Sequence, residues 1–361
     1  MKKQYTLTWI RFALLSLFTG FGFTAFAQTQ TQTITTTGTF QTPDGITSLR
    51  VECWGGGGRG GSTVSNGTET GGGGGGAYAR RNALTVTPRT NYNVQVGSGS
   101  TNTSPGGDTF FNNATTVMAK GGNSVANNTA TGASGGTAAA TVGDVTRNGG
   151  AGANGSNNNN GGGGGSSAGP DNAGVTATNQ NGATAPTGGG NGGNGRSGSN
   201  GNGTAGSIPG GGGGGVRSGN TGSFTGGAGA RGQVIVTWTC SNVLTSAVGT
   251  DDQNVCLGSP ITTITYTCSG AFGATFSGLP AGVTGTYTDG AIVISGTPTG
   301  LGTFTYTVTP TGSCTSSVVT GRIVVNPIPT DVTAVASSSS VCLGTAVNLI
   351  ASATSNSTTA V

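Results

Sequence analysis

Glycine dominates the sequence from Gly55 to Gly232, and this excess constrains the fold more than any other feature. The chain holds 75 glycines among 361 residues, and glycine has no side chain with which to build a hydrophobic core. Between about residues 97 and 229 hydrophobic periodicity is nearly absent. This region is therefore either a disordered linker or a structure held together by backbone hydrogen bonds.

Strand patterns bracket the glycines on both sides, which favours an ordered structure. "TFQTPDGITSLRVECW" (39–54) reads as a strand, a turn and a strand, and "AYARRNALTVTPRTNYNVQVG" (77–97) predicts a second pair. "GARGQVIVTWTC" (229–240) predicts a closing strand. We expect Trp54 and Trp238 to be core residues of this frame.

A triplet period replaces hydrophobic periodicity in "GGNGGNGRSGSNG" (189–201). Glycine recurs at Gly189, Gly192, Gly195, Gly198 and Gly201, with Asn191, Asn194, Ser197 and Asn200 in a second register. A polyproline II helix turns once per three residues and has no internal hydrogen bonds. We therefore predict a bundle of polyglycine II helices in which the glycine face packs and Asn and Ser face water. The all-glycine runs 71–76, 161–165 and 210–215 are expected at its centre, and the lack of proline argues against collagen.

A dinucleotide-binding motif, G-x-G-x-x-G, occurs at Gly55, Gly57 and Gly60 in "LRVECWGGGGRGG". Such a site needs a helix after the motif and an acidic residue at the end of a second strand. The following residues have no helical period and only Glu69 as an acid. We expect the motif by chance in so glycine-rich a chain, and predict no cofactor.

Catalytic side chains are scarce, so the sequence favours a non-catalytic protein. Histidine is absent, which removes the commonest general base and metal ligand. The paired carboxylates Asp251 and Asp252 offer at most a weak Ca²⁺ site, because calcium takes more oxygen ligands than this stretch supplies. We expect Arg59, Arg80, Arg196, Arg217 and Arg231, in or near glycine runs, to be solvated.

The N-terminus predicts export. Residues 1–27 combine Lys2, Lys3 and Arg11 with an apolar stretch, and Ala25-Phe26-Ala27 matches a signal peptidase site, so cleavage is expected between Ala27 and Gln28. The mature protein is expected to be extracellular or cell-surface, with no membrane span. With 14 basic and 10 acidic residues, some of them in the signal, the mature chain is nearly neutral and has no electrostatic footprint for nucleic acid.

The C-terminal third predicts β-sandwich structure. Short alternating strands separated by Gly, Pro, Asp or Asn turns fill residues 241–327. "VCLGSPITTI" from Val255 recurs as "VCLGTAVNLI" from Val341, an offset of 86 residues that suits one sandwich module. Residues 328–361 therefore read as the start of a second module, either belonging to a longer polypeptide or unfolded. Residues 28–240 form the glycine-rich domain in this scheme.

Six cysteines in an exported chain are disulfide candidates, and no C-x-x-C spacing occurs. Their positions in the repeat favour a Cys256–Cys314 pair within the sandwich. A Cys53–Cys240 bridge would connect the two framing strands, although Cys268 could instead pair with Cys240. Cys342 would then await a partner beyond Val361.

Two resemblances to known families add to the predicted domain organisation. "GTFQTPDGITSLRVECWGGGGRGG" (38–61), "GGGGGGAYARR" (71–81) and "GGAGARGQVIVTW" (226–238) resemble a bacterial glycine-rich surface domain family over about residues 33–239. "LPAGV" (279–283), "ISGTPT" (294–299) and "GTFTYTV" (302–308) resemble immunoglobulin-like or PKD-like repeats of bacterial surface proteins. Together they imply a Bacteroidetes-type cell-surface protein whose C-terminal sorting domain would lie beyond Val361.

The resulting expectation is a mainly β protein that works by adhesion or by ligand or matrix binding. The Asn, Ser and Arg loops of the glycine-rich domain would contact an unknown surface ligand, a glycan or a protein, while the sandwiches act as spacers. Two alternatives stay open: accessory binding modules of a larger secreted enzyme, and an ice- or matrix-binding structural protein with a flat polyglycine face.

Overall fold

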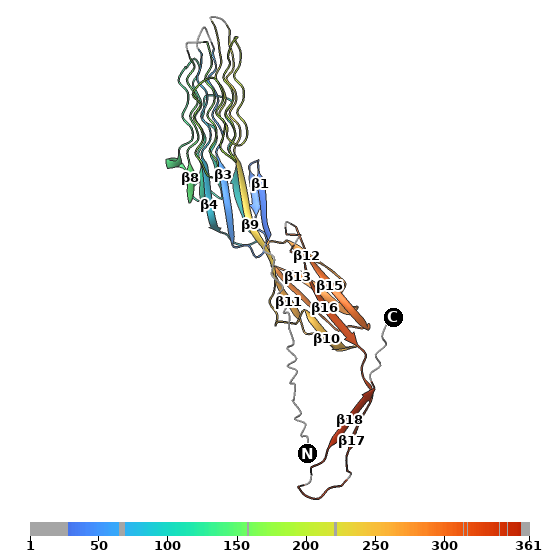
Figure 1. The fold of residues 1–361 in the computed structure, drawn as a ribbon. Helices are drawn as coiled ribbons and strands as arrows, with labels where there is room; N and C mark the ends of the chain where they lie inside the picture. The colour runs from blue at the N-terminus through green and yellow to red at the C-terminus, as the bar shows by residue number, and fades with distance from the viewer. Residues whose placement is uncertain are drawn as a thin grey trace, which may run out of the picture.

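The computed structural model describes residues 28–64, 69–156, 159–219, 222–312, 314–315, 317–338, 340–344 and 346–354. The predicted signal peptide, including Ala27, lies outside these residues. The chain is elongated, and its parts follow one another from one end of the molecule to the other (Figure 1). A glycine bundle stands on a β-frame, the frame continues into a β-sandwich, and a hairpin follows the sandwich.

The β-frame consists of two sheets whose strands precede, interrupt and follow the glycine segments in the sequence. Its strands are β1 (Gln28–Ile34), β2 (Gly38–Gln41), β3 (Ser48–Trp54), β4 (Tyr78–Thr85), β5 (Asn91–Gln95), β6 (Thr109–Phe111), β7 (Val117–Ala119), β8 (Val145–Arg147) and β9 (Gln233–Leu244), with a short 3₁₀ helix at Ala138–Ala140. One sheet carries β9, β3, β4 and β8 in that order, with β1 also paired to β9, and the other has the order β2-β5-β6-β7. The predicted strands correspond to β2 to β5 and β9.

Four strands of the frame were not foreseen from the sequence. The alternating Gln and Thr residues of β1 have no apolar period, and this strand owes its place to an antiparallel pairing with β9. The three-residue strands β6, β7 and β8 lie inside the region that lacks hydrophobic periodicity. Such short strands give too few residues for an alternating pattern to be recognised.

Aromatic side chains form the core of the frame, as the sequence predicts. Trp54 and Trp238 are 1% and 4% exposed. The ring of Phe40 packs between Phe111 and Trp238, at centroid distances of 5.9 and 5.8 Å. Trp54 also donates a hydrogen bond from Nε1 to the carbonyl of Ala168, 3.0 Å away, which joins the frame to the glycine bundle.

The glycine bundle has the hydrogen-bond pattern of polyglycine II helices. Amides of segment 70–77 donate in turn to three neighbouring segments, so that residues three apart share an acceptor segment. These bonds are Gly71 to Thr129 and Gly74 to Asn123, Gly72 to Ala153 and Gly75 to Gly150, and Gly73 to Gly213 and Gly76 to Gly210. The three-residue period therefore distributes backbone donors around the helix axis, and each helix binds several neighbours.

The three all-glycine runs lie together at the centre, as predicted. Gly165 donates to Gly73, Gly73 donates to Gly213, and Gly212 donates to Gly165, so runs 71–76, 161–165 and 210–215 contact one another in a triangle. The packing leaves no room for a side chain. A Cβ at Gly75 would lie 2.0 Å from the carbonyl oxygen of Ser166, and one at Gly213 would lie 1.8 Å from that of Gly227.

The polar register of the triplet repeat faces water and also makes edge contacts. Asn191 and Asn194 are exposed, and their Oδ1 atoms accept hydrogen bonds from the amides of Ala185 and Gly182. The triplet repeat of glycine continues in the sequence beyond the end of the polyglycine helix, however. Gly198 has a φ of +74°, which turns the chain back toward the frame.

The β-sandwich follows directly from the frame. Its strands are β10 (Asp252–Cys256), β11 (Ile264–Ser269), β12 (Gly273–Ser277), β13 (Val283–Thr288), β14 (Ala291–Gly296), β15 (Gly302–Thr311) and β16 (Val319–Asn326). One sheet has the order β13-β14-β11-β9 and the other β10-β16-β15-β12. Ile264, Ile292 and Ile323 are fully buried between them, and the hydroxyls of Tyr266 and Tyr306 share a 2.8 Å hydrogen bond.

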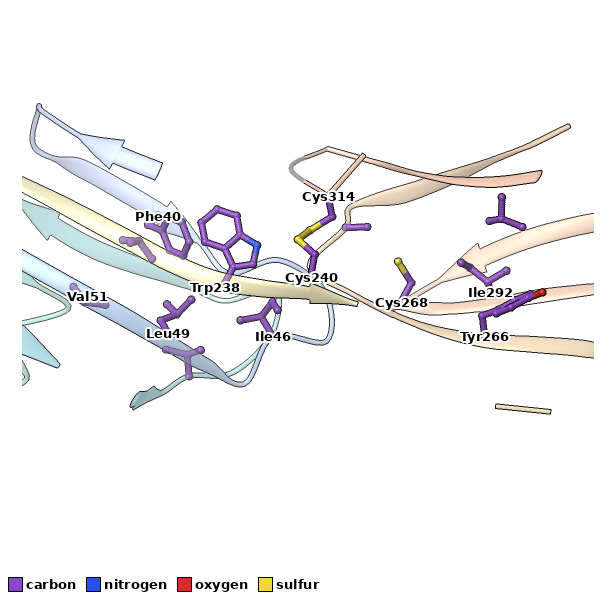
Figure 2. Packing of buried hydrophobic residues seen from close by; sticks show 14 of the residues in the cluster. Phe40, Ile46, Leu49, Val51, Trp238, Cys240, Tyr266, Cys268, Ile292 and Cys314 are labelled. Atoms are coloured by element: carbon purple, nitrogen blue, oxygen red, sulfur yellow. A yellow bond between two sulfur atoms is a disulfide. The ribbon is translucent and has the colours of Figure 1, made fainter. Parts of the chain in front are cut away.

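Strand β9 belongs to both the frame and the sandwich. Within its 12 residues, Val234 to Cys240 pair with β1, and Ser241 to Leu244 pair with β11. Buried side chains follow it from Phe40 and Trp238 to Tyr266 and Ile292 without a break (Figure 2). The two domains therefore share one hydrophobic core.

A disulfide and a buried carboxylate reinforce this junction. Cys240 is bonded to Cys314, 74 residues further along the chain (Figure 2). The Asp44 side chain is 3% exposed; its Oδ2 accepts a 2.9 Å hydrogen bond from the Tyr287 hydroxyl, and its Oδ1 lies 3.2 Å from Nε of Arg89. These contacts connect the frame turn to strand β13 of the sandwich.

The observed bond shows that the predicted pairs Cys53–Cys240 and Cys256–Cys314 are wrong. Cys53 lies opposite Val234 on β9, so six residues, about 20 Å of strand, separate it from Cys240. Cys256 lies beside Asn326, at the opposite end of β15 from Cys314. Cys268 is free as well, and its burial raises the pKa of the thiol to about 11, which keeps it protonated.

The last two strands, β17 (Thr330–Ala336) and β18 (Leu349–Thr354), form a separate antiparallel hairpin. By the 86-residue repeat, Ile350 corresponds to Ile264 of the sandwich. Ile264 is fully buried, whereas Ile350 is 66% exposed. The hairpin thus repeats part of the sandwich pattern without a covering sheet among the residues described.

Candidate binding surface at the distal end of the glycine bundle

Loops connect the glycine segments at the end of the bundle farthest from the sandwich (Figure 1). We call their described residues the distal loops: 62–64, 69–70, 126–131, 155–156, 159–161, 196–203, 216–219 and 222–226. Segments on either side of each loop run in opposite directions, as the bond pairs Gly58 to Gly74 and Gly61 to Gly71 show for the first loop. The chain therefore runs up and down the bundle, and it reverses direction at this end each time it has come up from the frame.

Amide and hydroxyl side chains cover the distal loops. Their exposed members are Asn127, Asn128, Thr131, Ser156, Asn159, Ser197, Ser199, Asn200, Asn202, Ser223 and Thr225. Short polar side chains of this kind offer both donors and acceptors of hydrogen bonds to a ligand. Large apolar side chains are few: among the described residues of the loops, Val64 is 59% exposed and Phe224 is half-buried.

Asparagine side chains also connect the loops to one another. The Oδ1 atoms of Asn128, Asn200 and Asn202 accept hydrogen bonds from the amides of Val64, Gly219 and Thr225, respectively. All three bonds are between 2.7 and 3.1 Å long. These loops are positioned by specific contacts, so their outer side chains are presented in a defined arrangement.

Three arginines lie in or beside the distal loops, and only Arg196 has the solvated environment that the sequence predicts. Arg196 is exposed and donates from Nε to the carbonyl of Ser199 at 3.1 Å. Arg217 is half-buried, and its Nε is buried without a hydrogen-bond partner. Arg59 is only 7% exposed, so the expectation of solvation is wrong for this residue.

Arg59 is a buried cation held by neutral groups. Nη1 donates to Ser62 Oγ at 2.8 Å and Nη2 to Asn127 Oδ1 at 2.7 Å, while Nε is buried and unpaired. Burial lowers the pKa of its guanidinium below the ordinary value, because desolvation disfavours the charged form. One feature of the sequence could have pointed to Arg59. It stands within "GGGGRGG", and its side chain has to lie outside the face on which the glycines pack.

A shallow groove of about 380 Å³ lies on the side of the bundle near the frame. Glycine backbone forms its floor, and Asp108 and Lys120 stand at one end, with Nζ 2.8 Å from Oδ2. Because the two charges neutralise each other and no aromatic side chain lines the groove, it is a weaker candidate than the distal loops.

The other sequence candidates are structural. Gly55, Gly57 and Gly60 continue from β3 into a bundle segment, and a Cβ at Gly57 would lie 2.1 Å from a backbone oxygen. Asp252 receives two hydrogen bonds from Arg322, at 2.9 and 3.0 Å, so its carboxylate already has a cationic partner. Arg80, Arg231 and Gln28 lie at the frame, away from the distal loops.

Across the described ranges, no three or more Cys, Asp or Glu side chains gather where they could hold a metal ion. Within those ranges there is also no helix long and apolar enough to cross a membrane.

The fold and the distal surface define a β-framed polyglycine bundle carried on a β-sandwich. Residues 32–239 match the model of the family described as a glycine-rich domain, which covers more than half of the 361 residues. The chain belongs to this glycine-rich domain family. A search of curated proteins gave no match.

Proposed function

We propose that this protein is an exported, non-catalytic adhesin or ligand-binding protein of the bacterial cell surface, and that its distal loops contact the ligand. The observation that supports this most is the placement of the loops. They stand at the far end of a body in which β9 and the shared core join the bundle to the sandwich. A surface at the end of a stiff support is accessible to a large ligand.

The sandwich acts as a spacer in this proposal, and the hairpin of residues 330–354 begins a further immunoglobulin-like module. The ligand is a glycan or a protein, since exposed amides and hydroxyls suit the polar groups of both. A disulfide at the junction agrees with an oxidising compartment outside the cytoplasm. The signal peptide expected from residues 1–27 supplies the export route.

Two bulky substitutions test the binding surface. Ser197 and Ser223 are exposed in separate distal loops, so Ser197→Trp and Ser223→Trp should block ligand approach without disturbing the packed glycines. We expect the purified chain to be captured by one or more spots of a glycan array or of immobilised matrix proteins, and both variants to weaken that capture at least tenfold.

The matched control is Val248→Trp, at a fully exposed position on the sandwich, which should leave capture unchanged. Absence of capture at micromolar protein, or equal loss with Val248→Trp, would contradict the proposal.

A further inference from the structure

We propose that strand β1 pairs with β1 of a second copy of this chain, and that the protein thereby forms a two-fold symmetric dimer through one edge of its frame. This inference does not depend on the ligand of the distal loops. It starts from the position of β1 on the flank of the frame (Figure 1). Within the described ranges, β1 pairs with β9 on one side and with no strand on the other.

The backbone of β1 is hydrogen-bonded along one edge and free along the other. In an antiparallel pair, every second residue points its N–H and C=O away from the partner strand. From Thr29 to Ile34, no backbone group bonds to any described residue outside β9. The register with β9 is unbroken over the seven residues of β1, so the free edge is regular. Such a row of outward donors and acceptors is a template for another strand.

The other edge strands of the frame and the sandwich carry features that prevent such pairing. β8 has only three residues, one of them an arginine, and β2 has only four. The middle residue of β7 exchanges backbone hydrogen bonds with Val142, and β10 carries the ion pair of Asp252 with Arg322. β12 and β13 cover each other, since a Cβ at Gly285 would lie 2.2 Å from the ring of Phe276. In contrast, β1 is long, uncharged and free of proline and bulges.

The sequence of β1 suits pairing with itself, because glutamine and threonine alternate up to Thr33. Gln30 lies opposite Trp238, whose side chain is buried, so the glutamines are on the core side of the sheet and the threonines on the outer side. Successive side chains point to opposite faces. A two-fold pairing that keeps both cores on one side of the joined sheet therefore places Gln opposite Gln and Thr opposite Thr. Amide then meets amide and hydroxyl meets hydroxyl, and each pair can share hydrogen bonds.

No charge opposes this contact. A two-fold interface brings side chains close to their own copies, so charged groups near the axis would repel one another. β9 contains no acidic or basic residue, and none occurs in the sequence from residue 28 to residue 43. Thr29, Thr31 and Thr33 are exposed, so the strand is accessible to a second copy.

The pairing orients the two copies in opposite directions. β1 is antiparallel to β9, which continues from the glycine bundle into the sandwich. Two antiparallel β1 strands therefore place the two bundles at opposite ends of the dimer. The frame sheets that contain β1, β9, β3, β4 and β8 become one continuous sheet across the two copies.

Sedimentation of the mature chain over the micromolar to millimolar range tests the proposal. We expect reversible dimers, and we expect hydrogen exchange in β1 to slow as the protein concentration rises. Thr29→Lys combined with Thr31→Lys and Thr33→Lys places like charges opposite each other, and should weaken dimerisation by about tenfold or more. The corresponding triple glutamate variant should be weakened as well. An equimolar mixture of the two variants should recover dimers, because opposite charges then face each other.

The matched control is Thr284→Lys combined with Thr286→Lys and Thr288→Lys, on the edge strand β13. These threonines also alternate and are exposed, and their replacement should leave dimerisation within about twofold. A monomer at every concentration, dimers that the β1 lysine variant leaves intact, equal loss in the β13 variant, or no recovery in the mixture would overturn the proposal. Capture of a ligand by the distal loops is a separate measurement, so failure of the dimer leaves the proposed function standing.

Discussion

The glycine bundle and the β-sandwich reach an ordered structure by opposite means. In the bundle, backbone donors and acceptors of neighbouring segments hold the chain, and side chains are excluded from the centre. In the sandwich, Ile264, Ile292 and Tyr306 fill the space between two sheets. The bundle should therefore be sensitive to any added atom at its centre, and the sandwich to removed atoms.

Adding one methyl group at the bundle centre should have the largest effect. Gly75→Ala places a Cβ 2.0 Å from the oxygen of Ser166, so packed backbone must separate, and we expect a loss of roughly 3–5 kcal/mol in the free energy of unfolding. Urea unfolding followed by hydrogen exchange would measure it. Gly38→Ala is the matched control, since nothing lies within 4 Å of its Cβ; similar stability of the two variants would contradict side-chain exclusion.

Removing atoms from the sandwich core should come next. Ile292→Ala leaves a cavity at a fully buried position and should cost about 2–5 kcal/mol. Hydrogen exchange should rise in β11 and β14, while the amides of Gly71 to Gly76 stay protected. Val248→Ala, at an exposed site, is the control and should change stability by less than about 0.5 kcal/mol. Loss of protection at the distal loops would mean that the two regions unfold as one unit.

The junction disulfide should contribute a somewhat smaller amount. Cys240→Ser with Cys314→Ser opens a loop of 74 residues, and we expect a loss of about 2–4 kcal/mol from the sandwich. Thermal unfolding with and without a reducing agent would check it. The exposed thiol Cys256 is free, so Cys256→Ser should be neutral; a matching loss there would instead support the Cys256–Cys314 pair.

The smallest of the expected effects is that of alkaline pH, which should lower the stability of the sandwich but not that of the bundle. Burial raises the pKa of Tyr266, Tyr287 and Tyr306, and the Asp44 carboxylate raises that of Tyr287 further. Their neutral form is favoured in the folded state, so this stability is present below the unfolded pKa of about 10 and is lost as pH rises through the higher folded values.

The melting temperature of the sandwich should thus fall by a few degrees above about pH 10, and less steeply in Tyr306→Phe. No tyrosine occurs between Gly97 and Gly232, so the bundle should keep its hydrogen-exchange protection over this pH range. Parallel loss in both regions would argue against the separate origins of their stability.

Local patterns were enough to predict much of this architecture. The framing strands follow from alternation, and the central runs 71–76, 161–165 and 210–215 follow from the need of packed polyglycine helices for bare backbone. The strand β1 could not be found in this way, because its alternating Gln and Thr residues are polar on both faces. Its position depends on a pairing with β9 about 200 residues away along the chain.

Features that depend on register or on distant packing were also beyond the sequence. Cys53 and Cys240 lie on paired or neighbouring strands, but antiparallel register places Cys53 opposite Val234. Arg59 was expected to be solvated because glycine runs carry no burial pattern. Its enclosure depends on Asn127, which is 68 residues away along the chain, as well as on the nearby Ser62. The loops of the glycine-rich domain were named from the sequence as the surface to test, whereas the hydrogen bonds that connect them, such as that from the amide of Val64 to Asn128, required the three-dimensional structure.

The continuity of β9 has a mechanical consequence. A ligand held at the distal loops would pull on segment 226–232, which enters β9 directly and runs along the long axis of the molecule (Figure 1). Force in that direction loads the hydrogen bonds of β9 to β1, β3 and β11 in shear, so that they resist together rather than opening one after another. The Cys240–Cys314 bond lies on the same line and carries tension covalently into the sandwich. The strand that joins the two domains is therefore also the element that transmits force between them.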